Sequence, residues 1–186
     1  MLELENLTYR EFLESENRDE YLFASKYAKQ YTDAIDIYGV GNIYEQPFGF
    51  VKDVQFDLET NQLSWDNLIN FICQVSKKDI KEIYNESFLR VCQFRMYLIN
   101  NIQALLDAEK KLLTSEASED EQQAGLGLFE NLGIFIQTDS LAGGDVLKHS
   151  EVRALPYSKC LTKLLLNKQL KDYQDNMNRI INNKHS

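Results

Sequence analysis

Histidine is almost absent from this sequence of 186 residues, which contains only His149 and the near-terminal His185. Enzymes that work through acid–base or nucleophilic chemistry need a titratable side chain positioned beside the reacting group. Asp145 and His149 are four residues apart, but no Ser or Cys lies in a nucleophile motif, and Cys160 is the only candidate partner. We therefore expect no catalytic site, with Cys160 as a buried thiol and His149 as a surface histidine.

The sequence also lacks the motifs that bind common cofactors. Residues 39–41 (Gly-Val-Gly) have no third glycine and no strand-to-helix setting, and no Gly-Lys-Ser/Thr sequence is present. The carboxylates of Asp139, Asp145 and Glu151 do not have the spacing of a calcium loop. We expect no cofactor and no metal ion.

Cysteine is sparse, and long apolar runs are missing. Cys73, Cys92 and Cys160 lie far apart, each inside an apolar helical pattern, which is typical of buried thiols in a reducing compartment. No stretch approaches the roughly 18 apolar residues that span a membrane. The first five residues, Met-Leu-Glu-Leu-Glu, are acidic and contain no apolar run. We expect no signal peptide and no contact with a membrane.

Positive charge is in deficit, since the formal net charge is −9 at pH 7. A surface of this sign repels a phosphate backbone, so we expect no sequence readout of nucleic acid. Hydrophobic residues at 44% and charged residues at 26% are ordinary values for a globular protein. The length predicts a single helical domain over residues 1–186.

One stretch, residues 86–114, contains neither proline nor glycine and is predicted to form one long helix. Its apolar residues follow a 4-3-4-3 spacing that returns to one helix face: Phe88, Cys92, Ile99, Ile102, Leu106 and Leu113. Arg95 and Glu109 occupy the two remaining positions of this stripe. They are too far apart to pair along one helix, so each either has a partner on another element or subunit or extends to the edge of the core. We expect a mainly α fold, a helical bundle around this long central helix.

Capping patterns predict where other helices begin. Four helices are expected to follow an N-terminal capping residue: Thr8, Ser64, Asp79 and Ser118. A further helix is expected from Asp19 to about Tyr31, and Gly133 is expected to end the helix that Ser118 caps, ahead of an extended run at 134–136. Pro156 suits the first turn of a last helix. An apolar stripe of that helix is expected to lie along the central one: Leu166, Leu170, Tyr173, Met177 and Ile180.

Residues 33–63 interrupt the helical patterns with glycines and one proline, and we expect a loop-rich section there. It has at most a small β-hairpin, formed by residues 48–51 and 54–58, because Val54, Phe56 and Leu58 alternate with polar residues. The segment 38–58 carries more aromatic side chains than a solvated loop needs, so either the chain's own helices or a partner covers them. The partner interface is expected to involve Tyr38, Tyr44, Phe48, Phe50, Arg95 and Glu109.

The second half of the chain has a recognisable order of elements and turn residues. It contains Glu109, Leu112-Leu113, Ala124-Gly125, Gly133, Leu141-Ala142-Gly143-Gly144-Asp145, Val152 and Leu155-Pro156-Tyr157 ahead of the last helix. This order resembles small morphogenesis proteins of tailed bacteriophages, of the connector, ring or assembly-chaperone type.

The resemblance implies a non-enzymatic structural or assembly protein of the head, connector or tail. Its partners would be other copies of itself and other virion or assembly proteins, in the virion or in the cytoplasm of the host bacterium. A second function stays open, a small acidic regulatory or inhibitory binding module that captures a host or phage protein. An oligomer or a particle-bound species is expected for the first function, and a monomer that captures one partner for the second.

Overall fold

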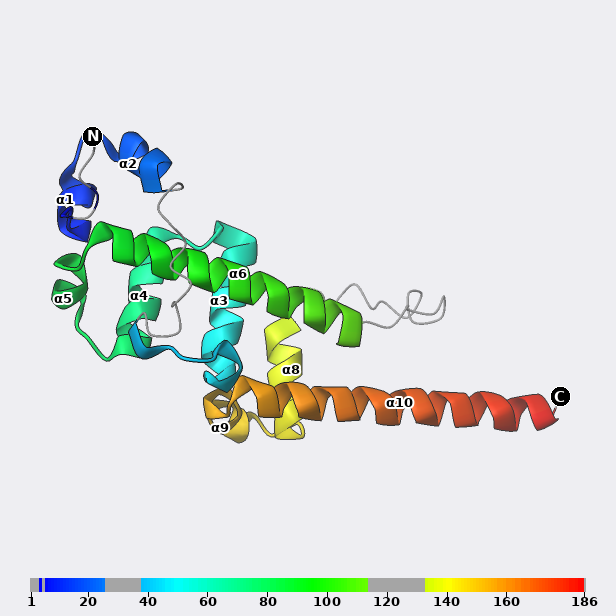
Figure 1. Cartoon of the computed structure of the whole chain (residues 1–186). Coiled ribbons are helices and arrows are strands. Elements are labelled where there is room, and N and C mark those ends of the chain that lie inside the picture. Colours follow the sequence, from blue (N-terminus) through cyan, green and yellow to red (C-terminus); the bar gives the residue numbers. More distant parts are fainter. Residues whose placement is uncertain (1–3, 5, 26–37, 114–132, 186) are drawn as a thin grey trace. The chain divides into compact units, whose positions relative to one another are not determined.

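The computed structural model describes residues 4, 6–25, 38–113 and 133–185 (Figure 1). These residues form helices and no β-strand, so the predicted mainly α fold is confirmed for the described part of the chain. The α-helices are α1 (Tyr9–Glu14), α2 (Arg18–Ser25), α3 (Phe48–Asn61), α4 (Trp65–Ser76), α5 (Ile80–Tyr84), α6 (Phe88–Leu113), α8 (Gly133–Ala142), α9 (His149–Ala154) and α10 (Tyr157–His185). Short 3-10 turns, η2 (Ile43–Glu45) and η4 (Val146–Lys148), precede α3 and α9.

The contacts within the chain group it into two compact units. Unit 1 contains residues 1–43 and 53–104, and unit 2 contains residues 44–52 and 105–186. Helices α3 and α6 each contribute residues to both units. The long helix α6 has 26 residues. That the chain forms a single domain, and that α6 is its central helix, stay predictions.

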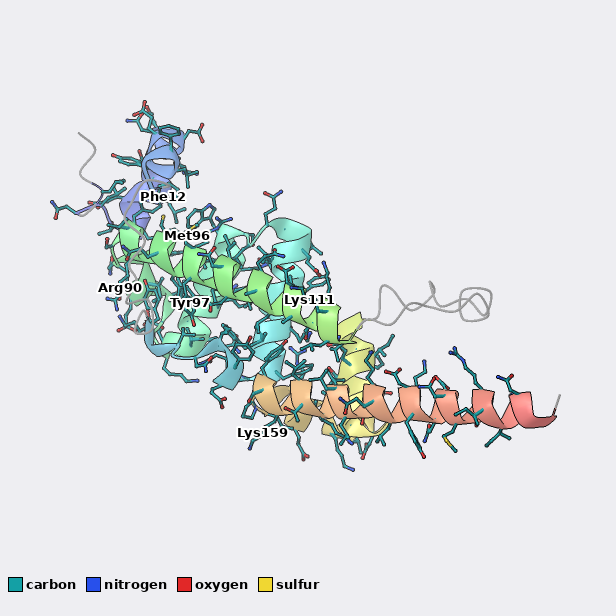
Figure 2. All side chains as sticks on the ribbon, turned by 45° about the vertical axis from the view of Figure 1, so that its right-hand side comes forward. Phe12, Arg90, Met96, Tyr97, Lys111 and Lys159 are labelled. Atoms are coloured by element: carbon teal, nitrogen blue, oxygen red, sulfur yellow. The ribbon has the colours of Figure 1, made fainter. Side chains whose placement is uncertain are left out.

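The core of unit 1 is an aromatic cluster contributed by α1, α4 and α6. The ring of Phe12 stacks on that of Phe88 with centroids 4.1 Å apart, and the Trp65 ring lies 5.7 Å from Phe12. Tyr9 packs against both Phe12 and Trp65. Figure 2 shows Phe12 where α1 meets the first turn of α6. A helix of six residues is not stable alone, so burial of Tyr9 and Phe12 is what stabilises α1.

The starts of α1 and α6 are bonded to each other through the backbone. The Tyr9 N–H donates to the Glu86 carbonyl at 2.9 Å, and the Phe88 N–H donates to the Leu7 carbonyl at 2.7 Å. The first N–H groups of a helix have no partner within it. Each helix therefore satisfies one such group of the other, which fixes the two starts side by side in unit 1.

Unit 2 repeats this arrangement at the starts of α3 and α10. The Phe48 N–H donates to the Leu155 carbonyl at 2.7 Å, and the Tyr157 N–H donates to the Gln46 carbonyl at 2.9 Å. Residues Pro47 and Pro156, which have no N–H of their own, lie opposite each other in this bridge. The prolines therefore occupy positions where no donor is lost.

The predicted helix starts are confirmed for three helices: α1 capped by Thr8, α4 capped by Ser64, and α5 capped by Asp79. The predicted start at Ser118 lies outside the described residues. Helix α2 covers the first part of the helix predicted from Asp19, and the rest of that prediction also lies outside them.

The predicted hairpin in residues 48–58 is wrong, because these residues form the first part of α3. Helix α3 is buried around most of its circumference, so its apolar residues do not show one clear helical period. Val54 is fully buried whereas Phe56 is 57% exposed, so the two do not share a face as they would in a strand. Among the described residues, the loop-rich section is limited to 38–47.

The predicted extended run at residues 134–136 is also wrong, because it lies in α8. Gly133 is the first residue of α8, and the preceding helix that it was expected to end lies outside the described residues. The Thr138 hydroxyl donates to the Ile134 carbonyl at 2.8 Å, one helical turn back. A three-residue apolar run fits either a strand or half of a helix, and the sequence pattern did not separate the two.

Candidate functional site

A buried ion pair joins three helices in unit 2. The ammonium of Lys52 on α3 lies 2.5 Å from Glu109 Oε1 on α6, and the hydroxyl of Tyr157 on α10 donates to the same oxygen at 2.8 Å. Lys52 Nζ also lies 5.6 Å from the ring centroid of Phe48 and 5.8 Å from that of Tyr157. Lys52 is 3% exposed and Glu109 8% exposed, so the pair is largely removed from water.

This cluster has the properties of a structural contact. Two buried charges are costly to desolvate, and the cost is offset only when geometry and additional hydrogen bonds are good. Here the Tyr157 hydroxyl supplies such a bond to Glu109, and two aromatic faces lie near Lys52. The sequence predicted that Glu109 needs a partner on another element or subunit, and that partner is Lys52 of the same chain.

Arg95 is satisfied within unit 1. Its Nε donates to the Leu63 carbonyl at 3.2 Å and its Nη2 to the Gln62 carbonyl at 2.6 Å. The guanidinium carbon lies 5.3 Å from the Trp65 ring centroid. Burial lowers the pKa of Arg95 from its usual value because desolvation disfavours the charged form. Arg95 therefore holds the turn between α3 and α4.

Three of the aromatic residues expected at a partner interface are in the core. Tyr38 is 5%, Phe48 0% and Phe50 2% exposed, whereas Tyr44 is 40% exposed. The Tyr38 ring meets Phe94 edge-on at 5.3 Å, and Phe48 stacks with the ring of Tyr157. The chain's own helices cover these three side chains, so the prediction that Phe48 is a surface anchor is wrong, and Tyr44 remains as the exposed member.

Unit 1 contains a hollow of about 500 Å³. It is lined by residues of α2, α4 and α6: Asp19, Leu22, Phe23, Trp65, Cys92, Arg95 and Met96. Phe23 is 62% and Met96 42% exposed at this hollow, and Figure 2 shows Met96 on α6. The ionisable side chains of this described lining are the Asp19 carboxylate, the Cys92 thiol and the Arg95 guanidinium.

The acidic and histidine residues singled out in the sequence have local partners in unit 2. His149 Nε2 lies 3.0 Å from Asp139 Oδ1, whereas Asp145, four residues before His149, caps η4 by accepting from the Leu147 N–H. Cys160 is 1% exposed, and burial raises the pKa of its thiol. Within the described ranges, no group of three or more His, Cys, Asp or Glu is placed to hold a metal ion.

The main exposed apolar surface of unit 2 is on α10. The first turns of this helix are buried, with Tyr157 0%, Cys160 1% and Leu164 9% exposed. The following large apolar side chains are between 39% and 63% exposed: Leu166, Leu170, Tyr173, Met177, Ile180 and Ile181. Figure 1 shows α10 continuing beyond α8 and α9 of the same unit, and Figure 2 shows its side chains projecting from the ribbon.

We name these six residues the α10 stripe. The sequence predicted the helix and its apolar face but placed that face along the central helix, which is wrong because the side chains are exposed. Ile181 was not part of the predicted set, although it directly follows Ile180 at the edge of the same face. The sequence pattern also did not identify Lys52 as the partner of Glu109. Its position among the apolar residues of 48–54 was the signal that could have indicated a buried lysine.

Comparisons with protein-family models, with curated proteins and with solved structures found no match for this chain. In the described part of the chain, no helix has the length and apolar content needed to span a membrane.

Proposed function

We propose that this protein is a non-enzymatic structural or assembly protein of a tailed bacteriophage, acting through protein–protein contacts in the virion or during its assembly. The observation that carries the proposal is the α10 stripe, six large apolar side chains half-exposed along one helix. Single exposed apolar residues are normal on a protein surface, but a contiguous apolar patch marks an interaction site.

The buried groups support a non-enzymatic role. Lys52, Glu109 and Tyr157 satisfy one another in the interior of unit 2, and Arg95 is bonded to backbone carbonyls in unit 1. Each of these groups has a packing role, because it connects segments that are distant in the sequence. The bacteriophage assignment is supported by the resemblance in the order of elements and turn residues along the second half of the chain.

Gradient sedimentation tests this function. Lysates of a bacterium that makes phage particles with this chain are separated, and fractions with heads, connectors, tails and their precursors are analysed by mass spectrometry. We expect the chain to sediment with particles or precursors. A chain that stays with small soluble proteins while particles form normally in its absence contradicts the proposal.

A matched pair of variants connects the result to the α10 stripe. Leu170→Glu places a charge in the stripe, and Asn178→Glu places the same charge at an exposed position of α10 outside the stripe. Leu170→Glu should reduce the share of the chain that sediments with particles at least tenfold, whereas Asn178→Glu should leave it unchanged.

A further inference from the structure

We infer that the α10 stripe is a self-association seam, on which the stripe of a second copy of this chain packs as a parallel, two-stranded coiled coil. The inference rests on the proposed function, and it names a second copy of the chain as the partner that covers the α10 stripe.

The spacing of the stripe is that of a coiled-coil seam. Five of its six members alternate by four and three residues, so they occupy the a and d positions of a heptad: Leu170 and Met177 at a, and Leu166, Tyr173 and Ile180 at d. This average of 3.5 residues keeps one apolar line facing a partner helix along the whole length. Residues 166–180 therefore present two complete heptads.

The positions beside the seam favour an identical partner. Charged residues at positions e and g normally set partner choice in coiled coils. Here the e positions are Asn167, Gln174 and Ile181, and the g positions are Gln169 and Asn176, none of which is charged. Two copies can therefore approach without placing like charges across the seam, and no charge pattern calls for a different partner.

The seam begins where the helix emerges from its own unit. Lys159 and Lys163 occupy the two preceding d and a positions and are exposed, so the apolar line does not extend to the turns that unit 2 buries. Those turns anchor α10 through Tyr157 and Cys160. The remaining part continues the same helix, so ordering it on association requires less conformational entropy than folding a free peptide.

The register selects the parallel orientation. In a parallel dimer with both helices in register, each of the five a and d residues faces its own counterpart in the second copy. Antiparallel packing pairs a positions with d positions, and with an odd number of seam residues at least one faces a residue outside the seam. Parallel pairing is the arrangement that covers all five.

Analytical ultracentrifugation of the full chain over a range of concentrations tests the seam. We expect a reversible dimer for the wild type, a dissociation constant raised at least tenfold for Leu170→Glu, and no change for Asn178→Glu. Circular dichroism melting of the same samples checks that both variants fold. A wild type that is monomeric at about 100 µM, or association that Leu170→Glu leaves unchanged, overturns the inference.

Disulfide formation tests the orientation. Ile180→Cys should give a covalent dimer under mild oxidation, because the two d positions face each other in the parallel register. Asp175→Cys, on the exposed opposite face, should not. An uncrosslinked Ile180→Cys sample overturns the parallel seam, since antiparallel helices would hold these positions about 15 Å apart or more at 1.5 Å of helix rise per residue.

The outcomes separate this inference from the proposed function. A monomeric chain that still sediments with phage particles overturns the seam and leaves the assembly function standing, because another virion protein then covers the stripe. A dimer that never sediments with particles or their precursors keeps the seam and overturns the assembly function. A monomer in which the stripe is protected from solvent exchange shows that the chain itself covers it, and this too overturns the seam.

Discussion

The Tyr157 hydroxyl and the Lys52 ammonium share one oxygen of Glu109, at 2.8 Å and 2.5 Å. This oxygen connects α3, α6 and α10 at a single point in unit 2, next to the backbone bridge between the starts of α3 and α10. Apolar side chains allow several packings of similar energy, whereas a buried charge has few satisfactory positions. We interpret the cluster as the contact that fixes how these helix segments align.

Lys52→Met should strongly destabilise the protein because it leaves the Glu109 carboxylate buried without its counter-charge. Breaking a buried pair from one side typically costs about 3–5 kcal/mol. The double variant Lys52→Met, Glu109→Leu removes both charges and should recover a large part of this loss. Urea unfolding of the wild type, the two single variants and the double variant measures the coupling. Additive effects would show that the two side chains do not act as a pair.

Phe48→Ala should destabilise unit 2, because Phe48 is fully buried and stacks on Tyr157. Removing a buried phenylalanine typically costs about 3–5 kcal/mol through lost burial and the cavity left behind. Tyr44→Ala is the control, since Tyr44 is 40% exposed and should change the unfolding free energy much less. Equal effects of the two substitutions in thermal unfolding would contradict the assignment of Phe48 to the core.

Local signals in the sequence predicted local structure well. A capping residue such as Ser64 acts on the N–H groups of the next turn, so its effect depends on neighbouring residues only. Residues 48–58 were misread because α3 is buried on more than one face, and burial depends on segments far along the chain. The partners of Glu109 and Arg95 lie 57 and 32 residues away in the sequence, at Lys52 and Leu63.

The same limit applies to the candidate site. The 4-3 spacing of the apolar residues in α10 can be read from the sequence, and it predicted both the helix and its apolar face. What covers that face depends on where the rest of the chain packs, and the spacing of apolar residues gives no information about that. The exposed side chains of Leu170 and Tyr173 are a property of the folded unit, and a helix buried against α6 would show the same pattern.

Arg95→Met should weaken the turn between α3 and α4. Gln62 and Leu63 adopt left-handed backbone conformations, with φ of 53° and 59°, which non-glycine residues rarely do. Arg95 donates to both of their carbonyls. A hydrogen bond that involves a charged group typically contributes about 1.5–3 kcal/mol to stability. We expect a loss of about this size in urea unfolding of Arg95→Met.

Gln62→Gly is the complementary change at the same turn. Glycine adopts a positive φ without steric cost, so this exposed position should gain stability, by about 1 kcal/mol. Introduced into Arg95→Met, the glycine should recover part of the loss. A destabilising Gln62→Gly in both backgrounds would show that the left-handed conformation is not a source of strain.

Tyr38→Phe should preserve or increase stability. The Tyr38 hydroxyl is buried, and no hydrogen-bond partner for it lies among the described residues. A buried polar group without a partner costs about 1–3 kcal/mol, and phenylalanine keeps the ring contacts with Phe94 and Arg90. Tyr97→Phe is the matched control, because the Tyr97 hydroxyl donates to the Gly41 carbonyl at 2.8 Å and its loss should destabilise.

Alkaline pH should enlarge the difference between Tyr38→Phe and the wild type. Burial, together with the nearby Glu86 carboxylate, raises the pKa of Tyr38 above its ordinary value. A group whose pKa is raised by folding contributes stability below its unfolded pKa, about 10 for tyrosine, and that stability is lost as the pH rises further. The free energy of unfolding of the wild type should therefore fall more steeply above about pH 10 than that of Tyr38→Phe. Urea titrations from pH 8 to 11 measure both slopes, and equal slopes would mean that the Tyr38 hydroxyl reaches water.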